Sequence, residues 1–319
     1  MFSIAKVKKI QHKEPPFIWP DTYSFALFLS HDIDQIYDRE LFRILADLNH
    51  IRRILIQGEK GSLLLAIRRL LRALFVPKPA YKDFKTILEI ESRYGFHSSF
   101  YVLHDPYWSR NGPRYTLNSK VLHKIVQFIQ ASGDEIGLHG GYYRFNQAEG
   151  YRESCEALRF VLGIEVAGIR NHFLRLSFPD TWLAQEAAGL RYDATFGYTD
   201  VLGPREGRIL PFFPVDPQTG RRLDIVALPM TVMDVTLFRS LGLHGETALK
   251  AAWDAIEPVV KAGGLVSLLW HNNYFNEPEY WDWQWVYEQL LQRLAALNPW
   301  CATGAEISEW WRSNAVGSE

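Results

Sequence analysis

The stretch Ser30-His31-Asp32-Ile33-Asp34 follows an apolar run that begins at Phe25. The run is long enough for one buried strand. Strand side chains alternate between two faces, so Asp32 and Asp34 share a face at the point where the run turns polar. Two like charges this close together usually share a metal ion or a proton. We therefore expect the reactive centre of the protein at the end of this strand.

The composition limits the classes to which the protein can belong. With 319 residues the chain has room for one large α/β barrel or two ordinary domains, and its net charge of -1 argues against nucleic acid as a partner. The aromatic content of 14% suits a protein that stacks on sugar rings, and a large core absorbs aromatic residues equally well. Cys155 and Cys301 match no metal or redox spacing, so we expect no disulfide scaffold.

The first residues carry no signal for export. They lack the apolar segment of a signal peptide, and no apolar stretch approaches the roughly twenty residues that span a bilayer. We therefore expect a cytoplasmic protein. Residues 1–22 are polar and rich in proline, which is typical of an entry arm, and residues 38–85 form a basic helical insertion after the first strand. We treat residues 1–319 as a single barrel domain.

Residues 62–75 combine a broad apolar face with arginines. A helix of this kind can make peripheral contact with an anionic membrane, which would place the protein at the inner face of the membrane. It can also cover a barrel wall and keep its arginines in water. Both interpretations stay open at the level of the sequence.

Strands and helices alternate along the rest of the chain. The predicted strands after the first cover 96–103, 135–139, 166–172, 190–196, 223–230 and 265–270. The predicted helices cover 80–94, 118–131, 147–162, 179–188, 246–262 and 281–297, and a loop covers 105–114. This rhythm indicates a parallel sheet, either open or closed into a barrel. No repeat or linker divides the chain.

Ionisable residues gather at the ends of these strands, where parallel α/β folds place their reactive groups. They are Asp32 and Asp34, His139, Arg170 and His172, Asp193, and His271. Each residue taken alone has a structural explanation, such as a helix cap or a buried hydrogen bond. Their order along the chain is the observation that points to a functional site.

That order resembles the NodB-type polysaccharide deacetylases, which are carbohydrate esterase family 4. The family's Thr-Phe-Asp-Asp-Gly looks like residues 30–34 in an Asp-x-Asp form, and its His-Ser/Thr-x-x-His resembles His139-Gly140-Gly141-Tyr142-Tyr143. Its Arg-x-Pro is similar to Arg170-Asn171-His172, and its Leu-x-Leu-His to Leu268-Leu269-Trp270-His271. The resemblance spans about residues 25–275 and implies a distorted (β/α)7 barrel. Two positions depart from it: Tyr143 replaces the second histidine of motif two, and His172 replaces the proline.

The resemblance implies a metal-dependent hydrolase that removes an N-acetyl or O-acetyl group from a sugar. Asp34 and His139 would be metal ligands, and Asp32 the general base that activates water. We take His172 as the third ligand, because an imidazole suits zinc or a similar divalent ion. Tyr142 and Tyr143 are rivals for this position, and His172 could instead form part of the groove wall.

The other roles follow from the same resemblance. Arg170 would hold Asp32 ionised, and His271 would be the general acid for the departing amine. Asp193 is a candidate to orient His271 or Arg170. The candidate substrate-binding residues are Tyr142, Trp270, Asn272 and Tyr274.

The expected substrate is a lipid-linked or nucleotide-linked precursor of a surface polysaccharide, because the chain shows no export signal. Two other functions stay open. The first is a non-catalytic carbohydrate-binding or scaffold protein on a deacetylase barrel whose metal site has decayed, which the missing histidine of motif two suggests. The second is a C–N hydrolase that acts on a small non-sugar amide.

Overall fold

The structure is a computed structural model that describes residues 19–36, 40–58, 63–75, 81–105, 111–277 and 280–314. Most of the predicted entry arm 1–22 lies outside the described residues. So do positions 38–39, 59–62 and 76–80 of the predicted insertion, and positions 106–110 of the predicted loop.

Nine strands of the described residues form one sheet in which every strand pair is parallel. They are β1 (Ala26–Ile33), β2 (Ser98–His104), β3 (Glu135–Gly140), β4 (Gly168–Asn171), β5 (Tyr192–Asp193), β6 (Val226–Ala227), β7 (Val232–Met233), β8 (Leu265–Leu269) and β9 (Trp300–Cys301). The order across the sheet is β6-β5-β4-β3-β2-β1-β8-β7, and β9 pairs with the start of β1. The predicted parallel α/β architecture is confirmed, while β7 and β9 were not predicted.

The sheet curls into an incomplete barrel whose two ends are β6 and β7. The short connection between these strands crosses the opening and holds it with backbone hydrogen bonds. Leu228 N–H donates to Asp193 O at 2.8 Å, and Thr231 N–H donates to Ser267 O at 3.0 Å. The barrel is therefore completed by a loop rather than by strand pairing.

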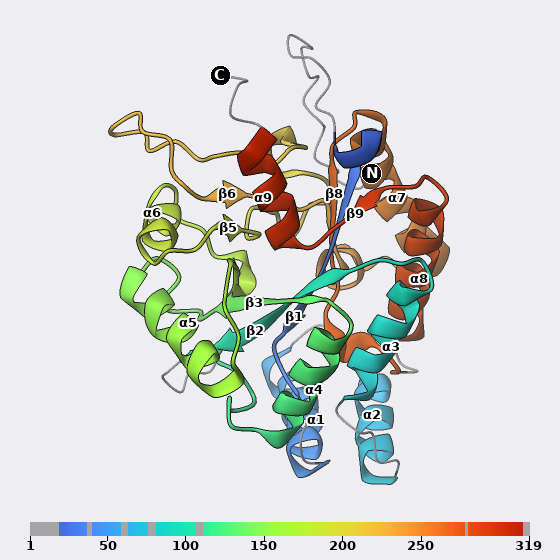
Figure 1. The fold of residues 1–319 in the computed structure, drawn as a ribbon. Coiled ribbons are helices and arrows are strands. Elements are labelled where there is room, and N and C mark those ends of the chain that lie inside the picture. The colour runs from blue at the N-terminus through green and yellow to red at the C-terminus, as the bar shows by residue number, and fades with distance from the viewer. Residues whose placement is uncertain are drawn as a thin grey trace.

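Helices surround the curled sheet and close one end of it (Figure 1). They are α3 (Lys82–Ser92), α4 (Lys120–Ala131), α5 (Ala148–Leu162), α6 (Asp180–Ala187), α7 (Gly245–Lys261), α8 (Trp281–Ala295) and α9 (Gly304–Asn314). Short 3-10 turns follow two of the strands, η2 (His172–Leu174) after β4 and η5 (Asn272–Tyr274) after β8. On α9, Ile307 and Trp311 pack with Phe28 and Tyr192 inside the barrel.

The alternation of β1 decides which of its residues reach the barrel interior. Leu27 and Leu29 pack in the layer between the sheet and the helices, whereas Ala26 and Phe28 pack inside the barrel. Because strand side chains alternate, Asp32 lies on the interior face with Phe28. His31 points the other way, where its Nε2 lies 2.8 Å from Glu91 Oε1 of α3. The polar end of β1 therefore aims Asp32, and not His31, into the barrel.

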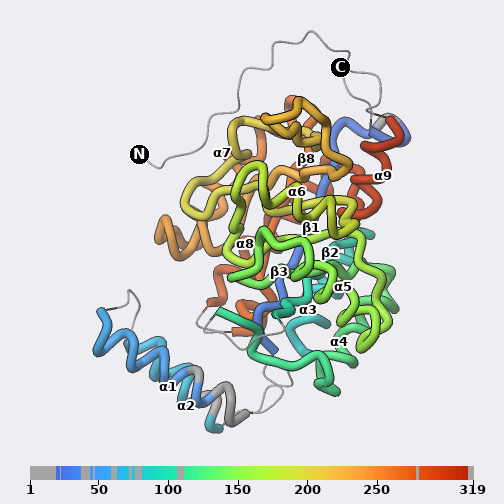
Figure 2. Tube along the Cα trace, turned by 90° about the vertical axis from the view of Figure 1, so that its left-hand side faces the viewer, coloured from blue at the N-terminus to red at the C-terminus, as the bar shows by residue number. Residues whose placement is uncertain are grey.

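The described part of the predicted insertion folds into two helices, α1 (Glu40–Gln57) and α2 (Leu63–Phe75). Figure 2 shows this pair as a hairpin that projects from the barrel. Arg69 of α2 links the two helices, since its guanidinium lies 3.1 Å from Asp47 Oδ1 of α1. It also links the hairpin to the barrel, because it donates to Tyr280 Oη at 3.2 Å. No helix among the described residues is both long and apolar enough to cross a membrane.

Candidate active site

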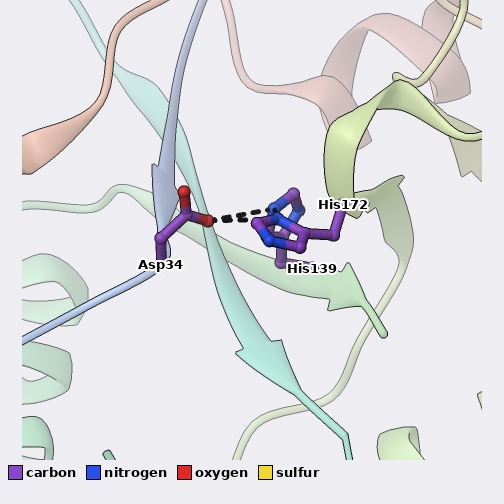
Figure 3. Close-up of side chains that lie close together, drawn as sticks. All are labelled: Asp34, His139 and His172. Atoms are coloured by element: carbon purple, nitrogen blue, oxygen red, sulfur yellow. Dashed lines mark hydrogen bonds and ion pairs between the residues drawn. The ribbon is translucent and has the colours of Figure 1, made fainter. Parts of the chain in front are cut away.

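Asp34, His139 and His172 come together at the carboxyl ends of β1, β3 and β4, as Figure 3 shows. Asp34 Oδ1 lies 3.2 Å from His139 Nε2 and 3.4 Å from His172 Nδ1, and the two imidazole nitrogens are 2.9 Å apart. Three residues that are far apart in sequence thus direct one carboxylate oxygen and two imidazole nitrogens at a common point. The structure places together Asp34 and His139, which the motifs predicted as ligands, and His172, which was inferred as the third.

The donor atoms of this cluster suit a divalent cation. His139 Nδ1 donates to the Arg170 carbonyl at 2.8 Å, which leaves the lone pair of Nε2 facing the cluster. Asp34 Oδ1 is buried and accepts no hydrogen bond, an arrangement that costs free energy unless a cation compensates it. A carboxylate and two imidazoles are the ligand types of zinc and similar ions. The residues present therefore fit the metal that the motifs imply.

Two of the three ligands, His172 and Asp34, have protonation states that suit metal binding. Burial lowers the pKa of His172 to about 4, so this imidazole is neutral near pH 7. For Asp34, burial raises the pKa, but the neighbouring His172 and His139 outweigh it and hold the pKa well below its usual range. A neutral imidazole and an ionised carboxylate are the forms in which these side chains bind metal. For His139, burial lowers the pKa but the neighbouring Asp32 and Asp34 raise it more, so a metal would displace a proton there.

Asp32 is held ionised beside the cluster by a buried arginine. Arg170 Nη1 donates to Asp32 Oδ1 at 2.9 Å and Nη2 donates to Ser30 Oγ at 2.8 Å. The other carboxylate oxygen of Asp32 lies 3.7 Å from His139 Nε2. Burial raises the pKa of Asp32, but His139 and Arg170 together lower it by more, so that the net pKa lies below its ordinary value. The predicted contact between Arg170 and Asp32 is present.

Arg170 is itself positioned by the barrel interior. Its Nε donates to Ala194 O at 3.0 Å, and its guanidinium stacks over the Tyr101 ring at 4.7 Å. All three nitrogens and one face of the guanidinium are thus in contact with the protein, which fixes the orientation of the Asp32 carboxylate.

His271 reaches the same site from the end of β8 and is held there by Asp234. His271 Nδ1 lies 2.8 Å from Asp234 Oδ1, and its backbone N–H donates to Asp234 Oδ2 at 2.7 Å. Its Nε2 lies 3.9 Å from Asp34 Oδ2. Burial lowers the pKa of His271, but Asp234 raises it more, to about 9. His271 is therefore protonated near neutral pH with Nε2 directed toward the site.

Asp234 replaces Asp193 as the carboxylate that orients His271, and the prediction for Asp193 is wrong. Asp193 accepts hydrogen bonds from Trp182 Nε1 at 2.9 Å, from Gln185 Nε2 at 3.0 Å and from Thr195. The reason is the alternation of β5, which places Tyr192 inside the barrel and turns Asp193 toward α6. Burial raises the pKa of Asp193 in this setting. In the sequence, the only signal for Asp234 is its place after the apolar pair of β7.

The structure also corrects two predicted substrate-binding residues near His271. Trp270 is fully buried, and its indole N–H donates to Trp283 O at 3.1 Å, because the strand alternation turns it toward α8. Asn272 is buried as well and donates to Gln35 O at 3.3 Å. Neither side chain is among the cavity residues, so the structure contradicts the prediction that they bind substrate there.

Tyr142 and Tyr274 have different positions. Tyr274 lines the cavity described below, under the guanidinium of Arg239 at 5.3 Å. The Arg175 guanidinium lies over the Tyr142 ring, 4.3 Å from its centroid. Tyr142 is not among the cavity residues, whereas the adjacent Tyr143 lines the cavity. Tyr274 thus lies at the wall of the cavity, where its predicted role in substrate binding would require it, and Tyr143 rather than Tyr142 lies at this wall.

The site opens into one cavity of about 1580 Å³. Its wall includes the cluster residues, His271, and side chains from both α1 and α2. Two exposed aromatic residues, Phe173 and Tyr143, also line it. Phe173 is 60% exposed, has a φ of 57°, and holds its ring 4.4 Å from that of His172. The left-handed backbone costs about 1–2 kcal/mol in a residue other than glycine. The sequence analysis did not single out Phe173.

Comparison with known proteins supports the fold. No family model matches the chain, and no curated protein matches it either. Among solved structures, a Mycobacterium smegmatis protein assigned as a polysaccharide deacetylase matches with a TM-score of 0.61 at 17% identity, covering 95% of each chain. Puue allantoinase matches with a TM-score of 0.63 at 14% identity, covering 97% of each chain.

These matches show the fold that the motifs predicted. The chain has the distorted (β/α)7 barrel of NodB-type polysaccharide deacetylases, in a divergent form, and allantoinase shares this barrel. The identities are too low to carry an activity or a substrate from either protein to this chain.

Proposed function

We propose that this protein is a metal-dependent deacetylase that hydrolyses an N-acetyl or O-acetyl group on a sugar of a surface-polysaccharide precursor. One observation carries the proposal. Three ligand-type side chains, the Asp32–Arg170 pair and the Asp234–His271 pair meet at the wall of a single cavity. Amide hydrolysis needs these three elements, because water must be activated, the carbonyl polarised and the leaving amine protonated.

Asp34, His139 and His172 would hold the metal, which we take to be zinc. When bound, the ion supplies a water of lowered pKa and a Lewis acid for the acetyl carbonyl. Asp32 lies next to these ligands, and Arg170 keeps its carboxylate ionised, so Asp32 accepts the proton of the attacking water. His271 starts protonated because of Asp234 and donates its Nε2 proton to the leaving amine.

The size of the cavity supports a sugar on a larger carrier. Sites for small ligands usually measure about 300–1000 Å³, and this cavity of about 1580 Å³ exceeds that range. The exposed rings of Phe173 and Tyr143 at its wall suit the apolar face of a pyranose. We place the reaction inside the cell, on a lipid-linked or nucleotide-linked precursor.

The alternative of a C–N hydrolase for a small non-sugar amide is favoured by one observation, the fold shared with an allantoinase. The cavity volume favours the sugar. The alternative of a decayed, non-catalytic site is disfavoured by the cluster itself. His172 supplies an imidazole where motif two has lost its second histidine, and Asp34 Oδ1 is buried without a hydrogen bond.

Acetate release from a panel of N-acetylated and O-acetylated sugars, run beside small non-sugar amides, tests the proposal. Protein loaded with zinc should release acetate from at least one sugar, and Asp32→Asn should lower the turnover by about 10²–10⁴-fold while the bound metal stays. Hydrolysis of the small non-sugar amides, with no acetate released from any sugar, would favour the alternative C–N hydrolase. Failure of the purified protein to bind any divalent metal would favour the non-catalytic alternative.

A further inference from the structure

The helix α2 exposes a row of large apolar side chains on the projecting hairpin. They are Leu64, Ile67, Leu71, Leu74 and Phe75, between 39% and 78% exposed, and we call them the apolar stripe. At 3.6 residues per turn their positions fall within about 100° of arc, so they share one face of the helix. None of them lines the cavity of the candidate site.

The buried face of α2 carries a small side chain. Ala66 lies on the side opposite to the apolar stripe and is only 3% exposed. A helix that covers a barrel wall turns its large apolar side chains toward the wall and its polar face toward water. Here five large apolar side chains face outward, while Leu63, Leu65 and Leu70 are half-buried. The structure thus decides against the simpler interpretation of residues 62–75, that of a helix covering the barrel.

The hairpin is also strongly basic. Residues 44–75 contain six lysines and arginines against two acids, within a chain whose net charge is -1. Arg68 is exposed at the flank of the apolar stripe, while Arg69 is tied to Asp47 and Tyr280. An exposed apolar face with cations beside it matches a lipid surface that offers acyl chains and anionic headgroups together.

We propose that the apolar stripe docks the protein on an anionic lipid bilayer. A contact between two copies of the chain through this face would bring two hairpins together that each hold six basic residues against two acids, so like charge would lie near like charge. An anionic bilayer instead places opposite charges beside Arg68 and buries the five apolar side chains. Charge complementarity therefore favours the bilayer over a second copy.

The same hairpin forms part of the cavity wall. Leu45, Asn49 and Arg52 of α1 and Arg69 of α2 line the cavity that contains the Asp34 cluster. Docking of the hairpin brings this cavity to the membrane surface. This step rests on the proposed deacetylase function and narrows its substrate to a sugar carried on a membrane lipid. Arginines in the wall suit the phosphate that links a sugar to such a lipid.

Sedimentation with lipid vesicles tests the docking. The wild-type protein should sediment with vesicles of phosphatidylcholine mixed with phosphatidylglycerol at low salt, and much less with pure phosphatidylcholine. The triple variant Ile67→Gln/Leu71→Gln/Leu74→Gln should lower the partition constant at least about tenfold. These side chains are exposed, so circular dichroism should show an unchanged fold.

A matched control comes from α5, where Phe160 is 92% exposed. Phe160→Gln removes an exposed apolar side chain away from the hairpin and should leave vesicle binding unchanged. Arg68→Gln should weaken binding to the anionic vesicles alone. Wild-type protein that stays in the supernatant with anionic vesicles overturns the proposal. A second outcome would also overturn it: the wild-type protein is a dimer, the triple variant is a monomer, and neither protein binds vesicles.

The test separates docking from catalysis. The triple variant should release acetate from a soluble acetylated sugar at the wild-type rate, because the substituted residues lie outside the cavity wall. Lost vesicle binding with retained activity supports both proposals. Vesicle binding without acetate release would leave docking in place and overturn the deacetylase function.

Discussion

His172 supplies the third donor of the candidate centre from the first position of a 3-10 turn, directly after β4. Replacing it by alanine leaves one carboxylate and one imidazole. We therefore expect His172→Ala to lower zinc affinity by about 100-fold or more. Calorimetric titration of the purified protein with zinc measures this change.

Tyr143→Phe is the matched control, because Tyr143 lines the same cavity and was a rival ligand. It keeps the ring and removes only the hydroxyl, so zinc affinity should stay at the wild-type value. A loss of affinity in Tyr143→Phe together with normal affinity in His172→Ala would assign the third ligand to the tyrosine.

Asp234 acts through His271 and is a positioning residue. Asp234→Asn removes the charge that keeps His271 protonated, while the amide oxygen can still accept one hydrogen bond. We expect kcat for acetate release to fall by about 10²–10⁴-fold with zinc affinity unchanged. Steady-state kinetics with parallel metal analysis measure both quantities.

Asp193→Asn separates this role from a general effect of a buried carboxylate. Asp193 bonds only to side chains of the helix layer and its own loop in the described structure, so the folded variant should keep the wild-type kcat. A large fall in kcat for Asp193→Asn and none for Asp234→Asn would restore the assignment that the sequence suggested.

Among the secondary-structure elements, a buried polar network ties β1 to α3 and α8. His31 Nδ1 donates to Trp270 O at 2.7 Å, and its Nε2 lies 2.8 Å from Glu91 Oε1. Tyr287 of α8 also donates to Glu91, and Ser98 Oγ donates to Glu91 Oε2 at 2.8 Å. Both ring nitrogens of His31 have a hydrogen-bond partner, so the strand that carries Asp32 and Asp34 is held against α3 and α8.

Removal of Glu91 should therefore cost a large part of the stability. Glu91→Ala leaves a buried imidazole without its carboxylate, and we expect the free energy of unfolding to fall by about 3–5 kcal/mol. Urea denaturation followed by tryptophan fluorescence measures it. Tyr287→Phe removes one donor and keeps the His31–Glu91 pair, so it should cost only about 1 kcal/mol. Equal losses in the two variants would contradict a central role of the pair.

The strands show where prediction from sequence succeeds among these elements. The first strand, with its apolar run and Asp-x-Asp end, was predicted because β1 is long enough for its sequence pattern to be recognised. The short strands β5 and β7 have two residues each, too few for a period to appear. Asp193 was therefore taken as the candidate to orient His271 or Arg170, and Asp234 was missed.

For the whole molecule, the candidate metal centre exists only in the folded chain. Its three ligands come from positions 34, 139 and 172 and meet through the pairing of β1, β2, β3 and β4. A ligand that binds only the native state stabilises it, by about 4 kcal/mol when its free concentration is a thousand times the Kd. Zinc should therefore raise the Tm by several degrees, and a chelator should reverse the rise.

Differential scanning calorimetry with and without zinc measures this effect, and His172→Ala provides the comparison. The variant should show a much smaller rise in Tm, because part of the binding free energy is lost. An equal rise in wild type and variant would indicate that zinc binds elsewhere. The free thiols of Cys155 and Cys301 need a reductant during the measurement.

The sequence by itself determined the alternating strands and helices, the common face of Asp32 and Asp34, and the set of strand-end residues Asp32, Asp34, His139, Arg170, His172 and His271. These follow from local patterns, since periodicity and chain order are visible without a fold. Only the tertiary structure decided that Asp234 holds His271, that Trp270 and Asn272 are buried, and that the large apolar face of α2 points outward. Those facts depend on which surfaces meet across the sheet and at the hairpin, and contacts between distant segments leave no period in the sequence.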